Sequence, residues 1–169
     1  LTNAAAFYSL LNVAVLFLGI DGEVVDVGCV SGSYQIQFYN GNNPFIPVID
    51  GEIVACPQLP TTLPTLDEIL ALEPGHSPDQ AADRILQLSS AIAGDHVFTL
   101  RAELEGLKFA SAFERLLAEW KNRDYSLLAL CDIRSTLDID SLPRHRVDFC
   151  EVPGRHGTRM TQGPVFLHD

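Results

Sequence analysis

Basic residues are missing from the first half of the chain. No Lys or Arg precedes Arg84, whereas ten acidic residues do, and the other 86 residues carry 11 basic and 12 acidic residues. The whole chain therefore has a net charge of −11. A surface that binds nucleic acid or an anionic membrane needs clustered Lys and Arg. We therefore expect no nucleic-acid partner.

Cysteines are few and far apart. The four are Cys29, Cys56, Cys131 and Cys150, and no two of them form a C-x-x-C pair. This spacing excludes a disulfide scaffold and a zinc knuckle. We expect reduced, mostly buried thiols in a cytoplasmic protein.

A hydrophobic run long enough to span a membrane is also missing. Residues 1–20 carry no charge, but polar side chains interrupt them, and the unbroken apolar run at residues 13–18 has the length of a strand. A spanning helix needs about 20 apolar residues, and a signal peptide begins with basic residues, which are absent here. A buried helix followed by a buried strand is the better interpretation.

The residues that are present predict one α/β domain over residues 1–169. Apolar residues make up 47% and charged residues 20%, which is enough to bury a core. Helix and strand patterns alternate through the middle of the chain, which favours parallel strands. We expect helices at residues 4–12, from Thr65, from Ser77 to Gly94 and at 109–120; strands at 13–19, 23–29, 33–39, 96–100 and 126–130; an extended proline-rich loop at 44–64; and an irregular tail after Asp138.

One candidate motif lies at residues 24–32 (VVDVGCVSG). It resembles the strand and glycine loop of Rossmann-type methyltransferases, with Asp50 near the place of a ribose-binding acid. Val30 stands where that motif has its middle glycine, and a strand-like segment follows instead of a phosphate-facing helix. A module that binds S-adenosylmethionine is therefore kept as an alternative.

His145 and His156 enclose Asp148 and Cys150 in the tail. Their spacing matches no standard metal pattern. We expect these histidines to pack the tail or to lie on the surface.

Two further segments carry the most specific pattern, residues 56–68 (CPQLPTTLPTLDE) and 97–106 (VFTLRAELEG). The second is a strand that leads into Arg101, Glu103 and Glu105. In a barrel of parallel strands, chemistry is placed at this carboxyl end. The alternative is that Glu103 and Glu105 are acidic residues at a helix start or partners in ion pairs.

Together these segments resemble the polysaccharide deacetylase (NodB-homology) family. The resemblance is to the bacterial branch that deformylates a formamido-arabinose sugar on an undecaprenyl lipid. It covers residues 38–137, while residues 1–37 do not align and residues 138–169 form the irregular tail. It implies part of a distorted (β/α) barrel and metal-assisted hydrolysis of an amide on a sugar or lipid-linked sugar.

The resemblance also implies roles for particular residues. The family holds a divalent ion such as zinc with an Asp and two His of its N-terminal half. Here no histidine precedes His76, so we expect no metal ligand and no cofactor in this chain alone. If the missing half is present, we expect a divalent metal such as zinc. The family's late catalytic histidine corresponds to Arg101, which can stabilise an oxyanion but cannot act as a general acid. We expect the remnant of the cleft to comprise catalytic Arg101, Glu103 and Glu105 and substrate-binding Thr65, Asp67 and Glu68.

Three hypotheses follow for the whole chain. It is the C-terminal part of a longer deacetylase, incomplete or inactive alone and completed by an N-terminal half or by a homo-oligomer. It is a noncatalytic protein that binds a sugar or serves as an assembly partner. Or it is the methyltransferase-like module suggested by residues 24–32.

Overall fold

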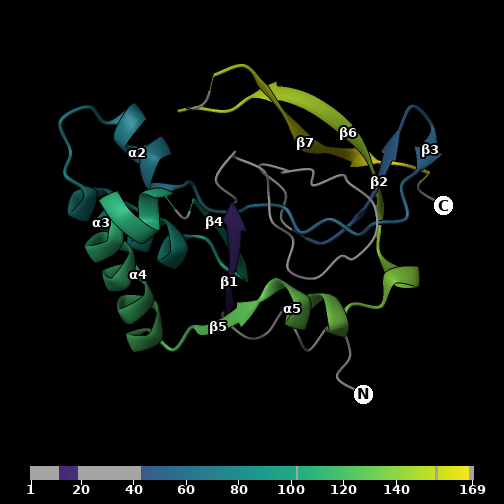
Figure 1. The fold of residues 1–169 in the computed structure, drawn as a ribbon. Helices are drawn as coiled ribbons and strands as arrows, with labels where there is room; N and C mark the ends of the chain where they lie inside the picture. The colour runs from purple at the N-terminus through teal and green to yellow at the C-terminus, as the bar shows by residue number, and fades with distance from the viewer. Residues whose placement is uncertain (1–11, 19–42, 102, 155, 168–169) are drawn as a thin grey trace.

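The computed structural model describes residues 12–18, 43–101, 103–154 and 156–167 (Figure 1). Their architecture is mixed α/β, with a three-stranded sheet in the order β4-β1-β5 and a four-stranded sheet in the order β3-β2-β6-β7. The predicted strands at 23–29 and 33–39 and the motif at 24–32 lie outside the described residues. So does the predicted helix at 4–12, except for Asn12, which is the first residue of a strand.

The three-stranded sheet is parallel, as the alternating pattern predicts. β1 (Asn12–Leu18) lies between β4 (His96–Arg101) and β5 (Ser126–Ala129) and pairs in parallel with both. The loop before the first described helix continues this arrangement, because Leu63 forms a parallel bridge with Phe98. The carboxyl ends of these segments therefore meet at one edge.

Two described helices begin where the sequence predicts them. α2 (Leu66–Leu72) is capped by Thr65, and α3 (Pro78–Ala91) is capped by Ser77, each through a reciprocal capping box. Such a cap is worth about 1 kcal/mol. α3 ends before the predicted Gly94, and α4 (Ala110–Asn122) extends past the predicted end at Trp120.

The main core lies between these helices and one face of β4. Phe98 and Leu100 are buried in it, and the ring of Phe98 meets the Trp120 indole edge to face at 5.4 Å. Successive side chains of a strand point to opposite faces, so Val97, Thr99 and Arg101 lie on the other face. There Val97 packs in a second, smaller cluster.

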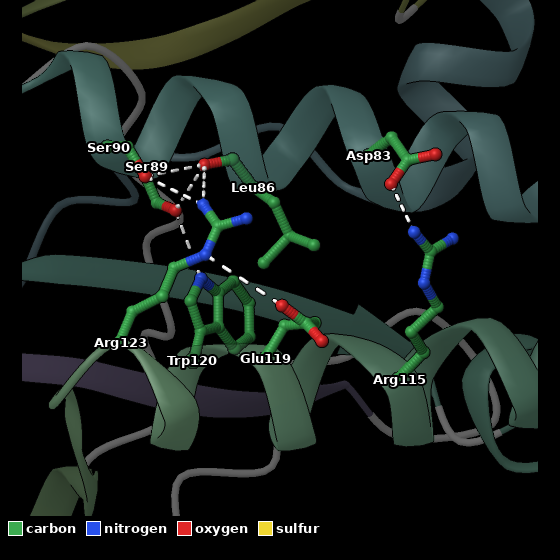
Figure 2. Close-up of polar contacts among 8 residues, drawn as sticks. All are labelled: Asp83, Leu86, Ser89, Ser90, Arg115, Glu119, Trp120 and Arg123. Atoms are coloured by element: carbon green, nitrogen blue, oxygen red, sulfur yellow. Dashed lines mark hydrogen bonds and ion pairs between the residues drawn. The ribbon is translucent and has the colours of Figure 1, made fainter.

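Polar side chains join α3 to α4 beside this core (Figure 2). The Trp120 indole N–H donates to Ser89 Oγ at 3.1 Å, and Arg123 donates to Ser90 Oγ at 2.8 Å. An ion pair between Arg115 and Asp83 joins the same two helices. The buried indole donor is therefore satisfied without water.

The Ser89 carbonyl also anchors the start of β4. It accepts hydrogen bonds from the Tyr125 hydroxyl at 2.6 Å and from Nε2 of His96 at 2.9 Å. Burial lowers the pKa of His96, and the Thr62 hydroxyl lies 3.3 Å from its Nδ1. This geometry fits a neutral ring protonated at Nε2, so His96 has a structural role.

The second sheet corrects the prediction of an irregular tail. β6 (Arg144–Glu151) and β7 (Thr158–Val165) form an antiparallel hairpin, and β6 also pairs in parallel with β2 (Ile46–Ile49). A short 3-10 helix, η2 (Ile139–Ser141), follows α5 (Leu130–Thr136) and precedes the hairpin. β6 and β7 are rich in Arg and polar residues, so they lack the apolar alternation that predicts a strand. The strand with which β6 pairs, β2, is also remote in sequence.

The proline-rich loop is extended as predicted, but part of it is paired. β2 and β3 (Glu52–Ile53) form a short hairpin. Asp50 and Gly51 make its turn, with φ values of 51° and 84°. Asp50 is thus an exposed turn residue in a different sheet from β1.

The β6–β7 hairpin arches away from β2, and its tip lies against α2 (Figure 1). The contact is close, since a Cβ atom built on Gly154 would lie 2.9 Å from the backbone oxygen of Glu68. Near the base of the hairpin, His145 donates from Nδ1 to the Gly163 carbonyl at 2.8 Å and packs its ring on Phe45. The predicted tail-packing role of His145 is confirmed.

Two cysteines belong to the described side chains, and both are free thiols. Cys56 is half-buried and Cys150 is exposed, so the expected burial is wrong for Cys150. Among the described residues, none of the helices has the length and apolar character needed to cross a membrane.

Candidate functional site

The candidate site is built where β4 ends. After Arg101 the chain enters a wide π-helical turn, η1 (Leu104–Lys108), of a kind found often at functional sites. The turn brings Glu105 back onto the strand, so that its Oε2 accepts the backbone N–H of Arg101 at 2.7 Å. The Glu105 side chain is almost completely enclosed, with 1% exposure.

This environment changes the acidity of Glu105. Burial, reinforced by the negative charges of Asp67 and Glu103, raises the pKa of Glu105 to about 7. The cause is that an ionised carboxylate loses solvation when buried and is repelled by nearby carboxylates. Near neutral pH the group is therefore able both to give and to take a proton.

The Arg101 guanidinium ties the end of β4 to the start of α2. Its Nη1 lies 3.4 Å from Oδ2 of Asp67, and Oδ1 of Asp67 accepts the Thr65 hydroxyl at 2.6 Å. About a quarter of each charged side chain is exposed, so the pair is partly open to solvent. Arginine keeps its positive charge at all ordinary pH values.

Four buried polar atoms near this pair have no hydrogen-bond partner among the described residues. They are Thr99 Oγ1, Arg101 Nε, Glu103 Oε2 and Glu105 Oε1. A buried polar group without a partner costs about 1–3 kcal/mol, so native proteins seldom keep several close together in the sequence. In native proteins such groups are explained by strain, by a catalytic role or by an ordered water or ion.

The structure gathers most of the predicted site residues. Thr65, Asp67, Arg101 and Glu105 are linked by the contacts above, and Glu103 lies near enough for its charge to act on Glu105. Glu68 has a different position, because its Oε2 accepts the Thr65 backbone N–H at 2.7 Å and its side chain is 1% exposed. It caps α2 and so fixes the segment that carries Asp67.

Thr99 is a candidate that the sequence analysis missed. Residues 96–100 were predicted as a strand without distinguishing its two faces. Side chains of a strand alternate between its two faces, so the sequence could have placed Thr99 on the same face as Arg101. Its hydroxyl is buried there, with 1% exposure for the residue.

The acidic side chains of the site do not make a metal centre. Within the described ranges, no group of three or more His, Cys, Asp or Glu residues is arranged to hold a metal ion. These residues therefore do not fit the divalent ion that the family resemblance implies. At the end of one strand they supply a positive donor, Arg101, held by Asp67, and a titratable acid, Glu105. A positive donor suits reactions that develop negative charge on oxygen.

Parts of two known proteins of the same name are similar to this chain. No protein-family model matches the chain. Over 117 residues, 69% of the chain, it is 28% identical to the probable 4-deoxy-4-formamido-L-arabinose-phosphoundecaprenol deformylase of Wigglesworthia glossinidia brevipalpis. Over 117 residues it is 30% identical to the protein of the same name from Shewanella sediminis (strain HAW-EB3). The match covers 40% and 36% of these relatives, so the chain spans about two fifths of their length.

Proposed function

We propose that the chain is part of an amide hydrolase that removes the formyl group from a lipid-linked formamido sugar. The similarity to two proteins named as deformylases of 4-deoxy-4-formamido-L-arabinose-phosphoundecaprenol supports the substrate class. The observation that carries the proposal is at the end of a parallel strand, where the Arg101 backbone N–H binds the titratable Glu105 and the Arg101 guanidinium pairs with Asp67. This is the edge at which barrel enzymes place their chemistry.

We also propose that the parallel sheet is one wall of a distorted (β/α) barrel. The continuous order of segment 62–63, β4, β1 and β5 supports this, because each neighbour is parallel to the next. The packing of α2, α3 and α4 on one face of β4 supports it too, since helices cover the outer face of such a barrel.

Hydrolysis of a formamide needs two kinds of assistance that these residues offer. Water adds to the carbonyl carbon and leaves a negative charge on oxygen, which the Arg101 guanidinium stabilises as a fixed donor. The C–N bond then breaks as the nitrogen takes a proton, and neutral Glu105 supplies that proton. The products are formate and a primary amine.

Other parts of the reaction are assigned to residues outside the described set. The base that activates water, and the ligands of a divalent ion such as zinc, would come from a complementing N-terminal part. The length of the relatives supports this, because the chain spans about two fifths of them. Activity is therefore proposed for the completed protein, with the lipid-linked sugar as its partner.

Formate release tests the proposal. The chain alone and the chain joined to the N-terminal part of the Shewanella sediminis relative are incubated with an N-formylated 4-amino-arabinose substrate. We expect release from the joined protein, with Arg101→Ala about 10²–10³-fold slower, as for loss of an oxyanion donor. Arg84→Ala, an exposed arginine on α3, serves as the matched control. Equal rates for the two variants, or no release from a folded joined protein, would overturn the proposal.

A further inference from the structure

We propose that Gly154, at the tip of the β6–β7 hairpin, is a positioning residue that holds Asp67 against the Arg101 guanidinium. The tip contacts α2 at Glu68, and the capping box of α2 carries this contact to Asp67. The inference goes beyond the proposed function, because it concerns the arrangement of side chains in the folded chain and needs no turnover.

The contact between the hairpin tip and α2 is close (Figure 1). A Cβ atom on Gly154 would lie 2.9 Å from the backbone oxygen of Glu68 and 3.2 Å from its Cα. Gly154 also has a φ of 81°, a conformation that glycine adopts without steric cost. Backbone atoms cannot turn aside as the end of a flexible side chain can. Position 154 therefore sets how near the hairpin comes to the start of α2.

A series of hydrogen bonds continues from this contact to the guanidinium. Glu68 Oε2 accepts the Thr65 backbone N–H at 2.7 Å, and the Glu68 backbone N–H donates to the Thr65 hydroxyl oxygen at 3.3 Å. The same hydroxyl donates to Asp67 Oδ1 at 2.6 Å. Asp67 Oδ2 then lies 3.4 Å from Arg101 Nη1. The hairpin tip and the Arg101 side chain are therefore the two ends of one chain of contacts.

The helix α2 is too short to fix Asp67 by itself. It has seven residues, and isolated helices shorter than about 12–15 residues are marginal in water. Leu66 and Ile69 anchor α2 in the main core, and Gly154 packs on it at Glu68. The Glu68 side chain is buried, and a close-packed interior transmits strain. We therefore expect a displacement of the tip to move the turn that carries Asp67.

Glu105 gives a measurable signal of where Asp67 lies. Burial is the main reason that the pKa of Glu105 is raised to about 7, and the charges of Asp67 and Glu103 raise it further. If Asp67 moves away, this repulsion weakens, and the pKa of Glu105 falls toward its reference value of 4.5. A loss of stability alone does not change the pKa of Glu105 in the folded chain.

NMR titration of the Glu105 side-chain carboxyl in the full chain tests the inference. We expect its pKa to fall in Gly154→Ala and in Gly154→Asn, which adds the same Cβ but tolerates a positive φ better. The fall should be no larger than in Asp67→Asn, which removes the charge itself. Gly157→Ala is the matched control, because Gly157 also has a positive φ but the nearest atom to its added Cβ, Arg159 Nη1, is 3.9 Å away. The control should keep the wild-type pKa.

Two further sets of variants test the route. In an Asp67→Asn background, Gly154→Ala should cause no further fall in the pKa of Glu105, because two changes along one chain of contacts are not additive. Thr65→Ala, which removes the hydroxyl between Glu68 and Asp67, should lower this pKa. Thr65→Ser should restore it.

Three results would overturn the inference. They are an unchanged pKa of Glu105 in the folded Gly154 variants, an equal fall in Gly157→Ala, and an undiminished fall in the Asp67→Asn background. Circular dichroism verifies folding. If both Gly154 variants unfold, amide hydrogen exchange of the wild-type chain decides. A Thr65 amide better protected than the β6–β7 amides would show that the cap persists without the hairpin, and would also overturn the inference. Absence of formate release bears on the proposed function alone.

Discussion

Replacing Glu105 by Gln should make the stability of the chain less dependent on pH. The substitution keeps an acceptor for the Arg101 N–H and removes the carboxyl that titrates. In the folded chain the pKa of Glu105 is about 7, against a reference value of 4.5. This difference corresponds to roughly 3 kcal/mol, because one pKa unit is about 1.4 kcal/mol.

The direction follows from where the proton is bound. Well below pH 4.5 Glu105 is protonated in both the folded and the unfolded chain, so it adds nothing to the pH dependence of stability there. Between pH 4.5 and about 7 the unfolded chain has lost the proton and the folded chain still holds it. The free energy of unfolding therefore falls as pH rises through this range and stays lower above it.

Denaturant unfolding at pH 4.5 and pH 8 measures the effect. Trp120 is the single tryptophan and is fully buried, so its fluorescence reports unfolding. We expect the wild-type chain to lose about 3 kcal/mol more than Glu105→Gln between the two pH values. Glu114→Gln should behave as the wild type does. The same pH dependence in Glu105→Gln and wild type would show that burial does not hold the proton on Glu105, and the reasoning would fail.

Three further predictions concern contacts that hold the site in place. Gly154→Ala should lower the free energy of unfolding by more than Gly157→Ala does. Both glycines have positive φ, but only at Gly154 would an added Cβ lie 2.9 Å from the backbone oxygen of Glu68. Urea titration of both variants measures the difference. Ser89→Ala should cost about 1–3 kcal/mol, since it leaves the buried Trp120 N–H without its acceptor; a blue-shifted or brighter Trp120 emission with unchanged stability would contradict this. Thr65→Ala should cost about 1 kcal/mol through loss of the α2 cap, and Thr65→Ser should restore it in the same thermal denaturation assay.

Local signals in the sequence predict much of this fold. Thr65 and Ser77 mark helix starts because capping is a contact between residues three apart. β4 is found because it is a short segment rich in apolar residues. β6 and β7 could not be found in this way. Their pairing with β2 depends on residues far away in the chain, and their alternation is hidden by Arg and polar side chains.

The sequence predicts which residues lie near the end of β4, but it does not predict their contacts. Arg101 and Glu105 follow a strand, and this order predicts functional side chains at the carboxyl end of that strand. The hydrogen bond between the two residues depends on a π-helical turn, which no residue spacing in the sequence predicts. The unpaired hydroxyl of Thr99 also depends on packing. Glu68 stands beside Asp67 in the motif, yet its side chain turns back to the backbone N–H of Thr65 and completes the capping box of α2.

The β6–β7 hairpin has a consequence for the order in which the chain assembles. It is made of the last described strands, yet its base pairs with β2 and its tip rests on α2. Pairing of residues remote in sequence is slow, because a long loop must close before any contact forms. On the ribosome, β2 therefore keeps one edge unpaired until β6, which follows it after a long stretch of chain, has emerged. We therefore expect the β6–β7 hairpin to pair late in folding.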